Sequence, residues 1–169
     1  MNLSQKVNNQ VCILLGGNLG QVKQNLETAS KYISEKIGTI HQKSSLYKSD
    51  AWGFESNDYF LNQVIIIETK LDAFEILKQT QEIEKVIGRK EKTTAQKYAS
   101  RLIDIDILFF NNDIIESKNL CIPHPRLHER NFTLLPLNEL LPNYIHPKIK
   151  KSILYLYSNS KDKGKCYKL

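Results

Sequence analysis

The sequence predicts an α+β fold, and three observations support this. Short apolar or β-branched runs, typical of strands, occur along the whole chain. Two longer segments carry apolar residues at three- and four-residue steps, as in amphipathic helices. The chain has 169 residues, of which 41% are hydrophobic and 25% charged, enough for one domain with a sizeable core.

The first predicted strand and helix come from an apolar run and an apolar stripe. Val11–Leu15 is continuously apolar, which is typical of a buried strand, and it ends at Gly16-Gly17-Asn18. This Gly-Gly-Asn segment lacks the spacing of a phosphate-binding loop, so we expect a tight turn before the helix. The apolar stripe from Val22 to Ile37 predicts that helix, and Gly38 ends it.

The middle of the chain predicts two further strands and a second helix. Residues 39–49 alternate loosely, which indicates a half-exposed strand, and residues 50–58 have the composition of a loop. The β-branched run at 60–69 is typical of a central strand. Asp72 is a good N-cap for the second helical stripe, which Gly88 ends.

The last third completes the order of elements. Residues 89–100 have no apolar period and predict a mobile loop, whereas residues 103–110 predict a strand. A turn at 111–113, a hairpin strand at 114–116 and a short helix at 134–140 follow. The order β-α-β-β-α-β is that of the split β-α-β, or ferredoxin-like, arrangement. We therefore expect an antiparallel sheet with both helices on one face, C-terminal additions, and the other face available for a site.

The net charge of +6 at first suggests a nucleic-acid partner, but its position argues against one. Residues 148–169 hold seven lysines and one acidic residue, which accounts for the whole excess. Residues 1–147 are neutral. We therefore divide the chain into a single domain at 1–147 and a solvated, Lys-rich tail at 148–169, and we expect no nucleic-acid partner.

The expected location is the cytoplasm, with no membrane partner. No apolar run approaches the ~20 residues that a membrane span requires. The N-terminus is polar and lacks the hydrophobic segment of a signal peptide. The three cysteines are an odd number without the spacing of a metal site, which is typical of a reduced chain.

The four arginines are confined to one stretch of the chain. Arg89, Arg101, Arg126 and Arg130 all lie within residues 89–130, and every other basic residue is a lysine. A guanidinium group binds phosphate in two-point contact, which an ammonium group cannot do. The stretch could bind phosphate, or its arginines could be surface residues and partners of carboxylates.

The segment around Asp104 and Asp106 carries the clearest chemical signal. Residues two apart on a strand point to the same side, so both carboxylates project together while the flanking isoleucines face the core. Two carboxylates on one face repel each other unless a cation joins them. Mg²⁺ is often held by one or two carboxylates together with substrate phosphates. We favour a metal site over acids that lie by chance on an exposed sheet edge.

Three weaker signals also have structural explanations, which are the commoner ones for the helix pair and for the aromatic residues. Gln81 and Glu84 are adjacent on the second helix and could line a cleft or a solvated helix edge. The two histidines and two arginines of residues 121–132 could bind an anion or form a polar surface loop. The aromatic residues near Asn62 could form a slot for a planar ring or belong to the core; they are Trp52, Phe54 and Phe60.

Five motifs together make the chain recognisable: LLGGNLG, YFLNQV, TQEIEKVIGR, SRLIDIDILFF and IPHPRLHERNF. With them the chain resembles the 6-hydroxymethyl-7,8-dihydropterin pyrophosphokinase family of folate biosynthesis, from about Val11 to Pro147. The resemblance implies a ferredoxin-like fold. It also implies transfer of the terminal diphosphate of ATP to the hydroxymethyl oxygen of the pterin, with release of AMP.

The resemblance also implies roles for individual residues. Asp104 and Asp106 would hold two Mg²⁺ ions, and Arg89 and Arg101 would act with them in catalysis. The pterin would be bound by Ser49, Trp52, Phe60, Asn62 and Phe132. ATP would be bound by Gln81, Glu84, Arg89, Tyr98, Arg101, Ile107, His124 and Arg130. We expect the enzyme to be a monomer whose partners are ATP and 6-hydroxymethyl-7,8-dihydropterin.

The chain departs from the family pattern at Ala99-Ser100, Cys121 and Pro125, which replace a frequent Gly-Pro, Thr and Tyr. The sequence gives less support to two alternatives to an enzyme. A ferredoxin-like RNA-binding module would carry an aromatic-rich strand, which is not evident here. A non-catalytic relative that acts by interaction alone would not need the intact pair of aspartates.

Overall fold

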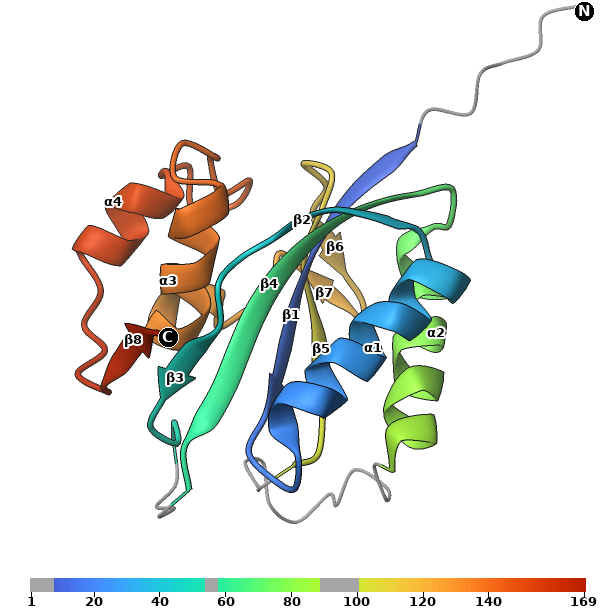
Figure 1. The fold of residues 1–169 in the computed structure, drawn as a ribbon. Coiled ribbons are helices and arrows are strands. Elements are labelled where there is room, and N and C mark those ends of the chain that lie inside the picture. Colours follow the sequence, from blue (N-terminus) through green and yellow to red (C-terminus); the bar gives the residue numbers. More distant parts are fainter. Residues whose placement is uncertain (1–7, 54–57, 89–100) are drawn as a thin grey trace, which may run out of the picture.

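The computed structural model describes residues 8–53, 58–88 and 101–169. Its centre is a twisted antiparallel sheet with the strand order β5-β1-β4-β3-β8, and β2 also pairs with β4 (Figure 1). The strands of this sheet are β1 (Asn9–Gly17), β2 (Thr39–Lys43), β3 (Tyr47–Ser49), β4 (Phe60–Thr69), β5 (Asp104–Phe110) and β8 (Cys166–Lys168).

Two long helices cover one face of the sheet. They are α1 (Val22–Lys36) and α2 (Ala73–Ile87), and both lie on the same side in Figure 1. Their apolar stripes meet alternate residues of the central strands, including Ile13, Ile65 and Ile105, in the main core. The element order and the single helical face confirm the predicted α+β, ferredoxin-like fold.

The ends of α2 follow the capping chemistry expected from the sequence. The carboxylate of Asp72 accepts from the backbone N–H groups of Phe74 and Glu75, and the Glu75 side chain accepts from the N–H of Asp72. At the other end Gly88 adopts a left-handed φ of 115°, which glycine tolerates without strain. The predicted boundaries of this helix are confirmed.

Two expectations about strands are corrected. Residues 39–49 form two strands, because the register slips between Ile40 and Gln42 and Ser44 then bonds with both backbone groups of Val64. The hairpin strand expected at 114–116 is β6 (Ile115–Glu116). It pairs with β7 (Cys121–Ile122) in a separate two-stranded sheet and not with β5.

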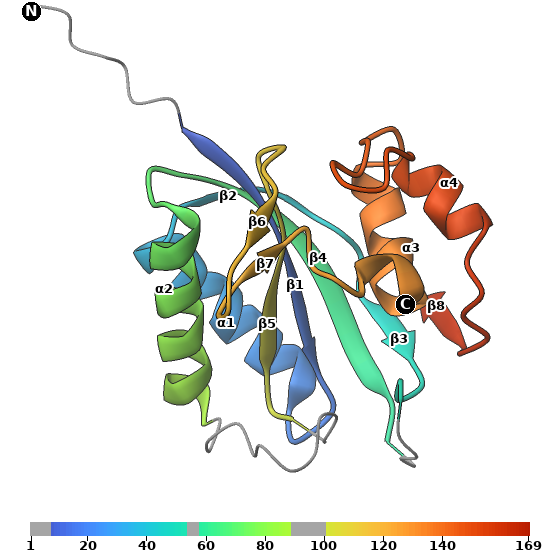
Figure 2. The same ribbon diagram turned by 180° about the vertical axis from the view of Figure 1, so that it is seen from behind.

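The opposite face of the sheet carries a second, smaller core. Helix α3 (Asn131–Leu140), helix α4 (Ile153–Ser158) and the short 3₁₀ turn η1 (Leu127–Glu129) lie on this side, near the β3 edge (Figure 2). Their apolar residues pack on Cys12, Leu14, Val64 and Ile66. This packing covers only part of the face.

The segment 148–169 is not the solvated tail that we expected. Ile153 is fully buried in the second core, and Leu156 packs against it. The chain then returns to the sheet, where β8 pairs with β3 and adds an edge strand. The many lysines obscured these few apolar residues, whose burial folds the segment onto the domain.

Within the described ranges, no helix is long and apolar enough to cross a lipid bilayer. The mobile loop expected at 89–100 lies outside the residues that the structure describes, and so do Arg89, Tyr98 and Phe54.

Candidate functional site

The base of the candidate site is a row of three residues across three strands. In the antiparallel register Gly16 of β1 stands opposite both Asn62 of β4 and Asp104 of β5, so all three share the face away from α1 and α2. Gly16 has no side chain and leaves open the space between the amide and the carboxylate. A Cβ atom there would lie 3.0 Å from Asn62 Oδ1, closer than an ordinary van der Waals contact.

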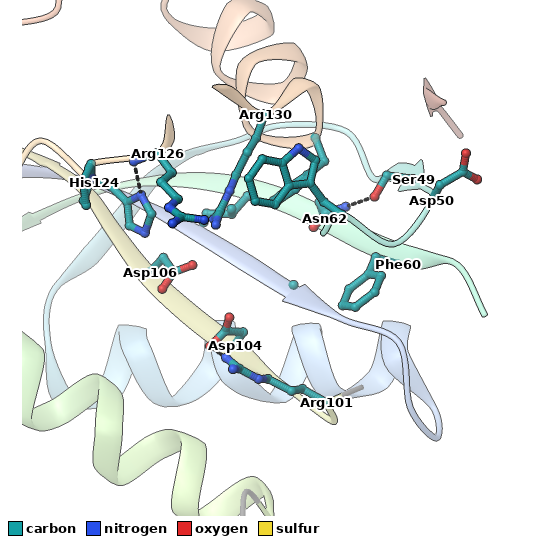
Figure 3. A pocket seen from close by; sticks show the side chains of 15 residues that line it. Ser49, Asp50, Phe60, Asn62, Arg101, Asp104, Asp106, His124, Arg126 and Arg130 are labelled. Atoms are coloured by element: carbon teal, nitrogen blue, oxygen red, sulfur yellow. Dashed lines mark hydrogen bonds and ion pairs between the residues drawn. The ribbon is translucent and has the colours of Figure 1, made fainter. Parts of the chain in front are cut away.

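Asp104 and Asp106 both project into this space, as strand alternation predicted. The intervening Ile105 and the following Ile107 point the other way, into the main core. Figure 3 shows the two carboxylates along β5, with Arg126 and Arg130 across the pocket from them and Arg101 beside Asp104. The prediction that they lie on one face is confirmed.

Arg101 is held at the mouth of the site by the Gly-Gly-Asn turn. Its backbone carbonyl accepts from the N–H groups of Asn18 and Leu19, at 2.9 and 3.1 Å, and its own N–H donates to Asn18 Oδ1 at 2.7 Å. Gly17 permits this contact, because a Cβ atom there would lie 2.7 Å from the Leu102 carbonyl oxygen. The turn therefore positions an arginine, whose Nη1 reaches Asp104 Oδ1 at 2.9 Å.

Asn62 is locked in one orientation. Its side chain is 2% exposed, and Nδ2 donates to Ser49 Oγ at 2.9 Å. Ser49 belongs to β3 and stands opposite Phe60 in the register, which places all three residues on the same face. The amide thus presents a fixed hydrogen-bonding edge beside an aromatic ring, which suits a flat heterocycle.

His124 is a neutral hydrogen-bonding group at this site. Burial, together with the positive charge of Arg130, lowers its pKa to about 4, although Asp104 acts in the opposite direction. Its Nδ1 atom accepts from the backbone N–H of Arg126 at 3.2 Å (Figure 3). A neutral imidazole that accepts at Nδ1 carries its proton on Nε2, so His124 can donate a hydrogen bond to an anion.

A buried arginine forms the wall opposite the aspartates. Arg130 is only 8% exposed, and its guanidinium carbon lies 4.6 Å from the centre of the Trp52 ring and 5.5 Å from that of Phe132. Burial lowers the pKa of Arg130 from its ordinary value, while the charge of Asp106 favours the protonated form. The arginine therefore stays cationic between aromatic rings and a carboxylate.

These groups line one pocket of about 320 Å³, which is in the usual range for small-molecule sites. It brings together ten of the residues predicted for the site: Ser49, Trp52, Phe60, Asn62, Arg101, Asp104, Asp106, His124, Arg130 and Phe132. Five more lining residues were not among the predicted site residues: Leu14, Gly16, Asp50, Pro125 and Arg126. Arg126 belongs to the arginine stretch and to the His/Arg loop of residues 121–132, and these two signals could have identified it.

Three predicted residues do not line the pocket. Ile107 is buried in the main core, and Gln81 and Glu84 belong to α2, which covers the opposite face of the sheet. Glu84 is 4% exposed and accepts from the backbone N–H of Ile105 at 2.9 Å. In this structure it therefore supports the strand segment between the two aspartates. Arg89 and Tyr98 fall outside the described residues.

The pocket offers few side-chain atoms that could bind a metal ion. The described residues contain no group of three or more His, Cys, Asp or Glu side chains that could hold one. Asp104 and Asp106 offer carboxylate oxygens alone, beside cationic groups suited to phosphate. This set fits Mg²⁺ held jointly by protein and phosphate, and it does not fit a metal site built from protein ligands alone.

Comparison with known sequences identifies what the chain is similar to. The family model for 7,8-dihydro-6-hydroxymethylpterin-pyrophosphokinase (HPPK) matches residues 12–142. A 2-amino-4-hydroxy-6-hydroxymethyldihydropteridine pyrophosphokinase of Aquifex aeolicus is 40% identical over 139 residues, covering 82% of this chain and 84% of the relative. The protein of the same name from Bacillus subtilis is 39% identical over 135 residues, covering 79% of each chain.

Solved structures share the fold. A crystal structure of the Plasmodium falciparum HPPK-DHPS protein superimposes with a TM-score of 0.74 at 21% identity, and covers 92% of this chain. A second HPPK-DHPS structure has a TM-score of 0.72 at 18% identity and covers 90% of this chain. This chain spans only 45% and 43% of those longer proteins. At this level of identity the likeness supports the fold alone.

Proposed function

The chain belongs to the 7,8-dihydro-6-hydroxymethylpterin-pyrophosphokinase family, and on that premise we propose that it transfers diphosphate from ATP to the hydroxymethyl group of 6-hydroxymethyl-7,8-dihydropterin, releasing AMP, in folate biosynthesis. One observation supports placing this reaction in the pocket. A single pocket holds two carboxylates on one strand, cationic arginines facing them, and a locked amide beside aromatic rings. Diphosphate transfer to a pterin needs both a nucleotide half, formed by the carboxylates and arginines, and a pterin half, formed by the amide and the aromatic rings.

The pterin half is assigned to Ser49, Trp52, Phe60, Asn62 and Phe132. The proposal is supported by the pocket lining and by the Asn62–Ser49 hydrogen bond, which fixes a donor and acceptor edge at the base. Phe60 and Phe132 offer rings from two separate elements, β4 and α3, and a flat ring can be held between such groups. Asn62 would then choose the ligand by its hydrogen-bonding pattern.

The nucleotide half is assigned to Arg101, His124 and Arg130, together with Arg89 and Tyr98 from the undescribed segment. Support comes from the position of the three described residues on the walls beside the aspartates. Arg101 and Arg130 would bind phosphate oxygens in two-point contact, and His124 would donate from Nε2. Gln81, Glu84 and Ile107 remain predicted ATP contacts that the pocket lining does not support.

We propose that activity depends on Mg²⁺, with Asp104 and Asp106 as the protein ligands of two ions. Two carboxylates on one face suit ions that are shared with ATP phosphates. When bound, the ions would neutralise charge on the phosphates and lower the pKa of the pterin hydroxyl. Arg101 would leave Asp104 and bind the phosphates, because the Asp104 carboxylate cannot fully neutralise both a guanidinium group and a Mg²⁺ ion.

The transfer is a substitution at the β-phosphorus. The pterin hydroxymethyl oxygen forms a bond to that phosphorus, the bond to the oxygen bridging the α- and β-phosphates breaks, and AMP leaves with that oxygen. The hydroxyl proton passes to solvent. His124 does not take it, because its Nδ1 already accepts a hydrogen bond and its Nε2 carries a proton. The arginines stabilise the developing charge.

We propose that the enzyme acts as a monomer in the cytoplasm. Every residue assigned to the pocket comes from this one chain, so the proposed chemistry needs no second copy.

The decisive experiment measures AMP release from ATP with 6-hydroxymethyl-7,8-dihydropterin over a range of Mg²⁺ concentrations. Asp106→Asn keeps the shape of the side chain but removes its charge, and we expect turnover to fall by about 10²-fold or more. Asp113→Asn, at an exposed position just after the turn at 111–112, is the charge-matched control and should retain activity. Near wild-type turnover of Asp106→Asn at saturating Mg²⁺ would contradict the proposed role.

A further inference from the structure

The C-terminal segment contacts elements that carry two walls of the pocket, without lining the pocket itself. After α4 the chain runs from residue 159 to 169 past the start of α3 and joins the sheet edge as β8 (Figure 1). We call residues 159–169 the C-terminal strap. Two of its contacts with the domain adjoin pocket residues, and the proposed roles of the pocket residues do not involve it.

The first contact caps α3 from a distance in sequence. Within the described chain, the N-cap residue Arg130 makes no capping hydrogen bond with its side chain. Asp162 supplies one instead, because its Oδ2 accepts from the backbone N–H of Asn131 at 2.8 Å. The Asn131 side chain donates back to the Asp162 carbonyl at 3.1 Å. The negative charge of Asp162 also lies at the positive end of the helix dipole.

This cap lies next to residues that line the pocket. Asn131 stands between Arg130 and Phe132, and both neighbours line the pocket. The direction of a side chain in the first turn of a helix depends on the backbone of that turn. A cap on Asn131 therefore helps to hold the backbone from which the guanidinium group and the aromatic ring project.

The second contact holds the end of β3. The backbone N–H of Asp50 donates to the Lys165 carbonyl at 3.0 Å, and the N–H of Lys165 donates to Asp50 Oδ2 at 3.2 Å. The pairing continues into β8, where Cys166 stands opposite Ser49. Ser49 and Asp50 both line the pocket, and Trp52 follows two residues later.

The strap itself is stiffened between the two contacts. Asp162 Oδ1 accepts from the N–H of Gly164 at 2.9 Å, so the same carboxylate that caps α3 also closes the turn leading to Lys165. One side chain thus links the start of α3 to the end of β3. These two elements carry Phe132 and Ser49, which belong to separate walls of the pocket.

We propose that Asp162 is a positioning residue for the pterin half of the site, acting through the C-terminal strap. Of the pocket residues with an assigned role that adjoin the two contacts, Phe132 and Ser49 belong to the pterin half and Arg130 to the nucleotide half, whereas Asp104 and Asp106 are on β5 at the far side of the sheet order. The strap therefore tunes pterin affinity more than ATP affinity. The inference rests on the proposed function for its substrate, but its structural part can be tested without one.

The test compares Asp162→Ala and Asp162→Asn with wild type in the full-length chain. Alanine removes both accepted hydrogen bonds, whereas asparagine keeps a single acceptor oxygen and can retain one of them. Asp113→Asn is again the control for loss of one negative charge. We measure KM for the pterin and for ATP separately, and the thermal unfolding midpoint of each variant.

Losing a cap of ordinary strength should raise the pterin KM about fivefold in Asp162→Ala, less in Asp162→Asn, with a smaller rise in the ATP KM through Arg130. Trp52 is the only tryptophan of the chain and lies against Arg130, so its emission reports on the pocket wall directly. The emission spectrum of Asp162→Ala without any substrate should differ from wild type.

Three outcomes would overturn the inference. They are an unchanged pterin KM, equal increases in both KM values, and a lower unfolding midpoint with wild-type Trp52 emission. If wild type released no AMP, the proposed function would fail, and the Trp52 emission would still decide whether the strap positions the pocket wall. If Asp162→Ala does not fold, Asp162→Asn decides both readouts.

Discussion

Replacing Gly16 by alanine tests whether the base of the pocket is shaped for one ligand. The new Cβ atom would lie 3.0 Å from Asn62 Oδ1 and 3.8 Å from the Leu61 carbonyl oxygen. The first contact is tighter than nearly all real Cβ contacts, so Asn62 or β1 has to move. Gly16 is paired as an ordinary strand residue, and the backbone there does not need glycine for its conformation. The expected effect is therefore on binding.

The size of the effect follows from how firmly Asn62 is held. The amide is 2% exposed and bonded to Ser49 Oγ, so it can swing away from the new methyl group only by weakening that hydrogen bond. A hydrogen bond of this kind contributes about 0.5–1.5 kcal/mol. We expect the pterin KM of Gly16→Ala to rise roughly two- to tenfold, with little change in the ATP KM.

A double-mutant cycle with Ser49→Ala tests whether the effect of Gly16→Ala acts through the Asn62–Ser49 hydrogen bond. In that background the amide has no bond to lose, so adding the methyl group at residue 16 should cost less than in wild type. The measurement is the pterin KM of the two single variants and of the double variant. Additive effects would refute the argument.

Two further predictions concern charge and pH. Arg101→Lys should lower the single-turnover rate about tenfold or more, because an ammonium group cannot bind phosphate in two-point contact. An unchanged rate would contradict this, and would show that Asp104, whose Oδ1 lies 2.9 Å from Arg101 Nη1, needs only a positive charge beside it. Burial lowers the pKa of His146 to about 4, and its neutral Nδ1 accepts from the N–H groups of Lys148 and Ile149. Since the unfolded chain takes up this proton near pH 6.5, the free energy of unfolding should fall as the pH drops from about 6.5 to about 4. Urea denaturation across this range should give a flatter profile for His146→Asn, and an equally steep profile would contradict the assignment.

The parts of the fold that depend on local chemistry were predictable from the sequence. Asp72 and Gly88 mark the ends of α2 because capping involves only neighbouring residues. Asp104 and Asp106 share a face because strand alternation has a period of two. Where a rule acts within a few residues, the sequence contains all the information that the rule needs.

The rest depended on contacts between distant segments. The register that sets Gly16 between Asn62 and Asp104 joins three strands far apart in the chain. No sequence period reports on it. The family resemblance implied that Glu84 contacts ATP, whereas in this structure packing turns it toward the backbone of β5. Asp162 was assigned to a tail, because its link to α3 exists only once the chain has folded back.

The free face of the sheet is divided between core and binding surface along a single row. Cys12 and Leu14 of β1 pack under α3 and α4, and two residues further along the same face Gly16 forms the base of the pocket. Leu14 takes part in both, so it marks the boundary. Because β1 lies between β4 and β5, a large side chain at position 16 would extend the second core between Asn62 and Asp104 and fill the space that a ligand needs. The glycine therefore has to lie on the central strand, since only there does its missing side chain leave the amide and the carboxylate facing one common cavity.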